Sequence, residues 1–308
     1  MGFYAPPGML VDDTRINSDG FTGNRLSDLS REKGVVRVLT LGGSTMFNRR
    51  MTERMIATWT DALPTTPLVV GAALRTHTTR ASVIKYDYLF SNYQFDYVLI
   101  YHGINDLWAN NVPPERFRQD YSHQNAWGRR SLLLDHSVIA RRIYNSLQTP
   151  QGPFPIRSNE AAFMADKAFE ANLRALIAEI RSNAGIPVLM TFAWFIPEQY
   201  SLEKFTAGEL PYNNPTRYDY CPVELWGDVA YVEEGLHRLN AIILSLAAEL
   251  EVGLIDQAQQ LGDISENFGD PVHFSELGTE RFIANITDYL LEDLAIRADI
   301  KGAGVPVN

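Results

Sequence analysis

The sequence predicts an α/β fold built on a doubly wound parallel sheet. Two observations lead to this prediction: short apolar segments recur along the chain, and longer stretches with helical periodicity separate them. Apolar runs are typical of strands covered on both faces, and alternation of strands with helices is typical of a parallel sheet. The predicted strands are Val35–Leu41, Pro67–Gly71, Phe95–Tyr101, Pro187–Phe192 and Val252–Ile255.

The stretches between these strands carry apolar residues at helical spacing. In the last of them, Phe282, Ile286 and Leu290 are spaced to face a core. Gly185 and Pro187 form a helix stop ahead of a new strand. The predicted helices are Met51–Leu63, Thr79–Ser91, Asn159–Asn183, Val229–Leu250 and Ser275–Ala295.

The 308 residues are expected to form an irregular arm, residues 1–33, followed by one domain, residues 34–308. No internal repeat or Pro/Gly/Ser-rich linker marks a second domain. Two stretches, 110–158 and 197–228, are longer than ordinary connections, and long loops in compact domains are often functional. We expect both to cover the carboxyl edge of the sheet as lids, with plain insertion loops as the alternative.

Bulk composition excludes several classes of protein. The apolar fraction of 45% and the charged fraction of 21% are ordinary for a soluble globular chain. A net charge of −10 argues against a nucleic-acid partner, and no apolar run is long enough to span a membrane. The first residues lack the pattern of a signal peptide. We therefore expect a cytoplasmic protein if Met1 is the native start, and a periplasmic or secreted one if an export segment was removed.

Neither a metal nor another cofactor is expected. The single cysteine, Cys221, rules out a thiolate zinc site, and the six histidines include no pair at metal-binding helical spacing. The same cysteine cannot form an internal disulfide.

The most informative stretch is the first predicted strand with the turn that follows, Gly42–Gly43–Ser44–Thr45. A buried strand that runs into a tight turn places a small hydroxyl at the carboxyl edge of the sheet, where open α/β folds bind their ligands. Ser44 is therefore a candidate nucleophile. The segment lacks the G-x-S-x-G pattern of the α/β-hydrolase elbow.

A base for such a nucleophile stands near the C-terminus, where Asp270 precedes His273 by three residues. A histidine can act as general base while a carboxylate orients it. Asp120 and His123 have the same spacing, but they lie in a long polar stretch, whereas Asp270 and His273 directly precede the last helix. We favour the second pair, and a surface turn is the alternative for either.

Asn105 follows the strand that ends at Tyr101, so its side-chain N–H can be directed at an oxyanion. The alternative is that Asn105 and Asp106 cap a turn. His102 is expected to be a packed residue at the strand end rather than a catalytic one.

Gly-Gly-Ser-Thr, Gly-x-Asn-Asp and Asp-x-x-His, in this order, resemble the SGNH (GDSL-like) hydrolase superfamily, in its Gly-Gly-Ser-Thr branch. The resemblance extends from about Asn17 to about Leu291. It implies a three-layer α/β/α sandwich with a five-stranded parallel, flavodoxin-like sheet, and an ester-cleaving serine. It further implies that Ser44 is the nucleophile, His273 the base, Asp270 its orienting partner and Asn105 an oxyanion donor.

The second sequence block of that superfamily is altered in this chain. The two threonines Thr78 and Thr79 anchor a register in which Ala73 occupies the position of the oxyanion glycine. A backbone N–H survives the exchange of glycine for alanine. Ser44, Ala73 and Asn105 are thus the expected oxyanion donors, and Gly71 replaces Ala73 if the turn is shifted.

These assignments predict a serine esterase that cleaves short acyl esters, with acetyl esters of carbohydrates preferred. Two alternatives are an O-acyltransferase with the same site and a non-catalytic carbohydrate-binding protein on the same fold. Aromatic residues suit sugar stacking, although core packing is the more ordinary role for most of them. The aromatic residues in and beside the long loops are Trp108, Trp127, Tyr200, Tyr212, Tyr218, Tyr220 and Trp226.

Overall fold

Six strands form the main sheet of the protein. A computed structural model describes residues 5, 7–11, 14–29, 35–123, 163–216 and 220–302. The strands lie in the order β3 (Thr22–Gly23), β5 (Thr66–Gly71), β4 (Val35–Gly42), β6 (Tyr97–Tyr101), β7 (Ile186–Met190) and β8 (Gly253–Ile255). The last five of these are mutually parallel, in the strand order of a flavodoxin-like sheet. The predicted five-stranded parallel sheet is confirmed.

The sequence analysis missed strand β3. It pairs antiparallel with β5, where Thr22 lies opposite Gly71. Two residues are too few to show a strand period, and β3 forms only because β5 offers an unpaired edge. A second short pair, β1 (Leu10–Val11) and β2 (Thr14–Arg15), precedes it. The division of the chain into an arm and a single domain stays a prediction.

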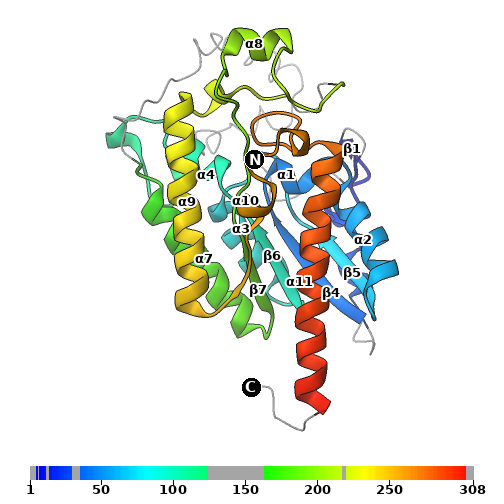
Figure 1. Ribbon diagram of the computed structural model, residues 1–308. Coiled ribbons are helices and arrows are strands. Elements are labelled where there is room, and N and C mark those ends of the chain that lie inside the picture. The colour runs from blue at the N-terminus through cyan, green and yellow to red at the C-terminus, as the bar shows by residue number, and fades with distance from the viewer. Residues whose placement is uncertain are drawn as a thin grey trace.

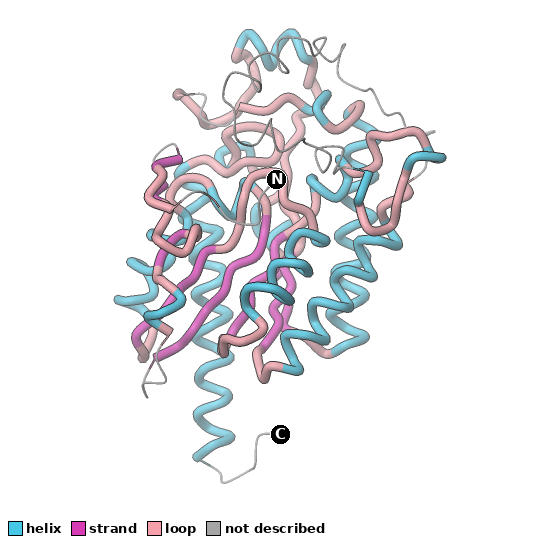
Figure 2. Tube along the Cα trace, turned by 180° about the vertical axis from the view of Figure 1, so that it is seen from behind, coloured by secondary structure: helices cyan, strands magenta, loops and turns pink. Residues whose placement is uncertain are grey.

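Helices cover both faces of the sheet and complete the three layers (Figure 1). Helices α2 (Met51–Ala62) and α11 (Glu276–Gly302) pack together on one face. Helices α3 (Thr79–Lys85), α7 (Asp166–Ser182) and α9 (Val229–Leu250) pack on the other face. Seen from behind, the sheet lies between these two helical layers (Figure 2).

Three predicted helices have different bounds. Of the predicted helix Thr79–Ser91, only Thr79–Lys85 is α-helical, and Tyr86–Phe90 form a π-helix. Helix α7 begins at Asp166, because residues 164–165 form a turn, and residues 159–162 lie outside the described part. Helix α11 continues past Ala295 to Gly302 and extends beyond the body of the protein (Figure 1). No glycine or proline interrupts residues 296–301, so nothing in the sequence stops the helix earlier. None of the described helices combines the length and apolar character that a membrane crossing requires.

Within the loop 197–228, helix α8 (Leu202–Ala207) lies over the carboxyl edge of the sheet (Figure 1). Aromatic side chains of this loop pack both on one another and on the core. Tyr220 stacks on Phe205 with ring centroids 3.9 Å apart, Tyr212 packs edge-on against Phe195, and Trp226 is buried in the core. Most of the other long loop, including Trp127, lies outside the described residues, as does Tyr218.

Candidate active site

The turn that carries Ser44 joins β4 to the short helix α1 (Ser44–Phe47). Two glycines are needed there because the chain passes close to its neighbours. A Cβ atom on Gly42 would lie 2.8 Å from the carbonyl oxygen of Tyr101, and one on Gly43 would lie 2.4 Å from Nδ2 of Asn105. Both distances are shorter than real carbon contacts allow, so the turn can place Asn105 against Ser44 only with glycine at position 43.

Ser44, His273 and Asp270 form a continuous hydrogen-bonded chain. Ser44 Oγ lies 2.8 Å from His273 Nε2, and His273 Nδ1 lies 2.7 Å from Asp270 Oδ2. His273 and Asp270 belong to the segment between β8 and α11, which folds back on itself so that Gly269 donates to the His273 carbonyl. The structure thus brings together three residues that were selected on sequence, two of them separated from Ser44 by more than 220 residues.

The Asp270 carboxylate is fully buried, and both of its oxygens accept hydrogen bonds. Its Oδ1 accepts the N–H groups of Val272 and His273, and its Oδ2 accepts the N–H of Cys221 as well as the His273 ring. These donors hold the carboxylate in one orientation, and the carboxylate in turn selects the His273 tautomer with its proton on Nδ1. That tautomer leaves Nε2 free to accept the Ser44 proton.

Two opposing effects act on the pKa of His273. Burial disfavours the imidazolium, but the Asp270 carboxylate outweighs burial and raises the pKa of His273. Asp270 therefore makes His273 a stronger proton acceptor than a free imidazole.

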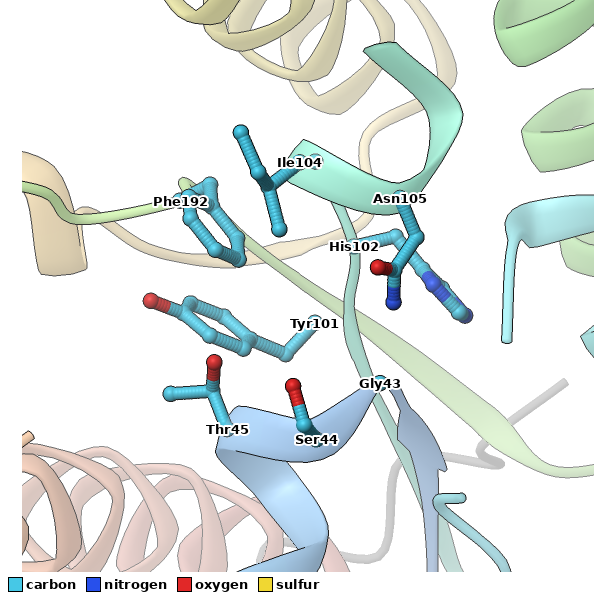
Figure 3. A pocket seen from close by; sticks show the side chains of 9 residues that line it. Gly43, Ser44, Thr45, Tyr101, His102, Ile104, Asn105 and Phe192 are labelled. Atoms are coloured by element: carbon cyan, nitrogen blue, oxygen red, sulfur yellow. The ribbon is translucent and has the colours of Figure 1, made fainter. Parts of the chain in front are cut away.

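Asn105 lies in helix α4 (Ile104–Trp108), directly after the carboxyl end of β6. Its Nδ2 donates to the His77 carbonyl at 3.0 Å. An amide nitrogen has two hydrogens, so one remains for a ligand beside Ser44. Figure 3 shows the Asn105 amide on one side of the Ser44 hydroxyl.

The peptide N–H groups around Ala73 alternate in direction. The Ala72 and Leu74 amides donate to the carbonyls of Thr40 and Gly42 on β4. Because neighbouring N–H groups of an extended chain point to opposite sides, the Ala73 N–H is directed away from β4. Gly71 lies deeper in the sheet, packed against Thr22 and Thr52. The described contacts do not test either residue as an oxyanion donor, and both assignments stay predictions.

The part of the second block that touches the site is the turn after Ala73. Its His77 carbonyl binds Asn105, and its Thr76 has a left-handed backbone with φ of 63°. The sequence analysis considered this turn but assigned no role to His77. The only available signal was the pair of threonines, because Thr79 Oγ1 and N both donate to the Asp106 carboxylate.

A second serine–histidine pair lies behind the site. Ser82 Oγ lies 2.8 Å from His102 Nε2, and His102 Nδ1 lies 4.0 Å from Asp106. All three residues are buried; His102 lines the cavity beside Ser44, whereas Ser82 and Asp106 do not. Burial, together with the nearby Lys85 charge, lowers the pKa of His102 to about 3. The expectation that His102 is a packed residue agrees with these contacts.

The residues of the other Asp-x-x-His copy, Asp120 and His123, form hydrogen bonds with residues nearby in the sequence. Asp120 accepts the N–H of Ser122, and His123 accepts the N–H of Arg118 while its Nε2 lies 2.9 Å from the Ala109 carbonyl. None of these hydrogen bonds joins Asp120 to His123, so this copy is a loop-stabilising turn.

Cys221 is a neighbour of the site that the sequence analysis did not predict. Potential ligand atoms of Cys221, Asp270 and His273 lie within 4.8 Å of one another, the one such group found among the described residues. Ser44 and Asp270 already occupy both ring nitrogens of His273. We therefore describe this group as a hydrogen-bonded cluster.

A serine, a histidine and an aspartate at the carboxyl edge of a flavodoxin-like sheet define a serine hydrolase of the α/β/α class. A profile of the GDSL-like Lipase/Acylhydrolase family matches residues 8–281. This match covers most of the chain, so the protein belongs to that family and is a carboxylic-ester hydrolase.

Solved structures with the same fold share little sequence with this chain. An Axe2 mutant, an acetyl-xylooligosaccharide esterase from Geobacillus, is 13% identical with a TM-score of 0.50, covering 84% of this chain and 96% of its own. A GDSL-like lipase from Bacteroides thetaiotaomicron is 15% identical with a TM-score of 0.46, covering 87% and 95%. No curated protein matches the chain. These likenesses concern the fold alone.

Proposed function

We propose that the protein hydrolyses esters of short carboxylic acids, above all acetyl esters of carbohydrates, through an acyl-enzyme at Ser44. One observation carries the proposal: Ser44, His273 and Asp270 are joined by hydrogen bonds of 2.8 and 2.7 Å, in the order that nucleophilic catalysis requires.

In the first half of the reaction His273 Nε2 takes the Ser44 proton as Oγ bonds to the ester carbonyl carbon. The tetrahedral oxyanion then collapses, the carbon–oxygen bond to the alcohol breaks, and the leaving alkoxide takes the proton from His273. In the second half a water molecule gives its proton to His273 and attacks the acyl-enzyme. The bond between Ser44 Oγ and the acyl carbon then breaks, Oγ takes the proton from His273, and the acid is released.

The oxyanion needs N–H donors on the side of Ser44 that faces Asn105. The Ser44 N–H and the second Nδ2 hydrogen of Asn105 supply two of them in this mechanism. Each such donor contributes about 10²–10³ in turnover. The turn of residues 74–78 lies next to Asn105, and we place any further backbone donor there.

Labelling with a fluorophosphonate tests the nucleophile. The reagent should modify the wild type and fail to modify Ser44→Ala. Ser82→Ala is the matched control, because Ser82 also lies 2.8 Å from a histidine but is buried. Labelling that persists in Ser44→Ala would contradict the proposal.

Acetylated xylo-oligosaccharides are suitable test substrates, since a neighbour of the same fold is named an acetyl-xylooligosaccharide esterase. Release of acetate from them, lost in His273→Ala and kept in His123→Ala, would support both the substrate class and the base. The opposite pattern would place the base in the loop.

A further inference from the structure

A small cavity opens beside the Ser44 hydroxyl. Its volume of about 10 Å³ compares with the roughly 10–15 Å³ that holds one water molecule on the same measure. The cavity therefore has room for about one water-sized group beside Ser44, such as a methyl group.

The lining of this cavity has a polar side, with Asn105 and His102, and a mostly apolar side, which also includes Thr45. Figure 3 shows the Asn105 amide on one side of Ser44, and the rings of Tyr101 and Phe192 with the Ile104 side chain on the other. An acetyl group has the same division, because its carbonyl oxygen accepts hydrogen bonds and its methyl group does not.

Contacts on several sides hold the apolar wall in place. The backbone N–H and C=O of Phe192 are both bound by the Asn240 side chain of α9, at 2.7 and 2.9 Å. The Phe192 ring stacks on Tyr101 with centroids 4.9 Å apart, and the Tyr101 hydroxyl accepts the Ala193 N–H. Gly103 lies so close to the Phe192 ring that a Cβ there would be 2.6 Å from Cγ.

We infer that this cavity is the acyl subsite, and that Ile104 and Phe192 restrict it to the acetyl group. The inference rests on the proposed acyl-enzyme at Ser44. A longer acyl chain would have to displace a wall that is held by Asn240, Tyr101 and Gly103, and tightly packed interiors resist such displacement.

The test is a series of p-nitrophenyl acetate, propionate and butyrate, whose leaving group is constant. One methylene in a hydrophobic pocket changes kcat/KM by roughly 10–200-fold. In the wild type we expect kcat/KM to fall by at least about 100-fold from acetate to butyrate, which differ by two methylenes. In Ile104→Ala the butyrate-to-acetate ratio should rise by about 10-fold or more.

Leu107→Ala is the matched control. Leu107 lies on the same short helix and is as deeply buried as Ile104, but it packs against Gly235 of α9 rather than lining the cavity. In Leu107→Ala the butyrate-to-acetate ratio of kcat/KM should remain that of the wild type. Phe192→Leu is a second, milder enlargement in case Ile104→Ala does not fold.

Distinct outcomes separate this inference from the proposed function. Equal rates for acetate and butyrate in the wild type would overturn the inference alone. A butyrate-to-acetate ratio that stays unchanged in folded Ile104→Ala and Phe192→Leu would also overturn the inference alone. Absence of activity on all three esters together with no labelling of Ser44 would overturn the proposed function itself.

Discussion

Replacement of Asp270 by asparagine changes one oxygen of a buried carboxylate into an NH₂ group. In the wild type Oδ2 accepts the Cys221 N–H at 2.9 Å and the His273 Nδ1–H at 2.7 Å. Oδ1 already accepts two backbone N–H groups, so we expect the amide oxygen to remain there. The NH₂ group would then face His273 Nδ1, which can accept its hydrogen only in the opposite tautomer.

In that tautomer His273 carries its proton on Nε2, directed at Ser44, and it can no longer accept the serine proton. Loss of the correct tautomer lowers kcat by about 10⁴ in a triad of this kind, which equals about 5.4 kcal/mol of transition-state stabilisation. Removal of the carboxylate also removes the charge that raises the pKa of His273.

The assay is kcat/KM for p-nitrophenyl acetate as a function of pH. The base must be neutral, so activity rises with pH through the pKa of His273 in the free enzyme. Asp270→Asn should lower the plateau and move this limb to lower pH. A variant that keeps activity within about 10-fold of the wild type, or a limb that moves to higher pH, would refute the reasoning.

Three further predictions concern neighbouring residues. Asn105→Ala should lower kcat for p-nitrophenyl acetate by about 10²–10³ through loss of an oxyanion donor; an unchanged kcat would remove Asn105 from the mechanism. Gly43→Ala should lower kcat through the same donor, because its Cβ would meet Nδ2 of Asn105 at 2.4 Å. In an Asn105→Ala background it should therefore lower kcat little further; losses that multiply in the double variant would contradict this coupling. Burial lowers the pKa of Lys85 to about 7, so unfolding binds a proton between about pH 7 and 10.5, and the free energy of unfolding rises with pH in this range. Urea unfolding at several pH values should show this rise in the wild type and not in Lys85→Met; an equal rise in both would contradict the lowered pKa of Lys85.

Local patterns predicted the parallel strands because each has its own apolar signature. The edge strand β3 has none, since Thr22 and Gly23 become a strand only by pairing with β5. Helix α11 ends seven residues later than predicted, at Gly302, because no glycine or proline stops it earlier. Helix ends of this kind are poorly defined by sequence.

Those parts of the candidate site could be predicted whose residues lie close together in the sequence. Asp270 and His273 were chosen over an equally spaced pair by their place before the last helix. What separates the two copies physically is their partners: His123 is bound by Arg118 and Ala109, which are near in sequence, whereas His273 meets Ser44. The direction of the Ala73 N–H was not predictable, because it depends on which amides pair with β4.

The sequence by itself determined the class of fold, the family and the residues able to supply a nucleophile, a base and a carboxylate, because apolar periodicity and short motifs are properties of neighbouring residues. The tertiary structure decided which serine–histidine pair is open to substrate, that Cys221 lies at the site, and how small the cavity beside Ser44 is. These features depend on distances between segments far apart in the chain, which are set by sheet order and helix packing rather than by local pattern.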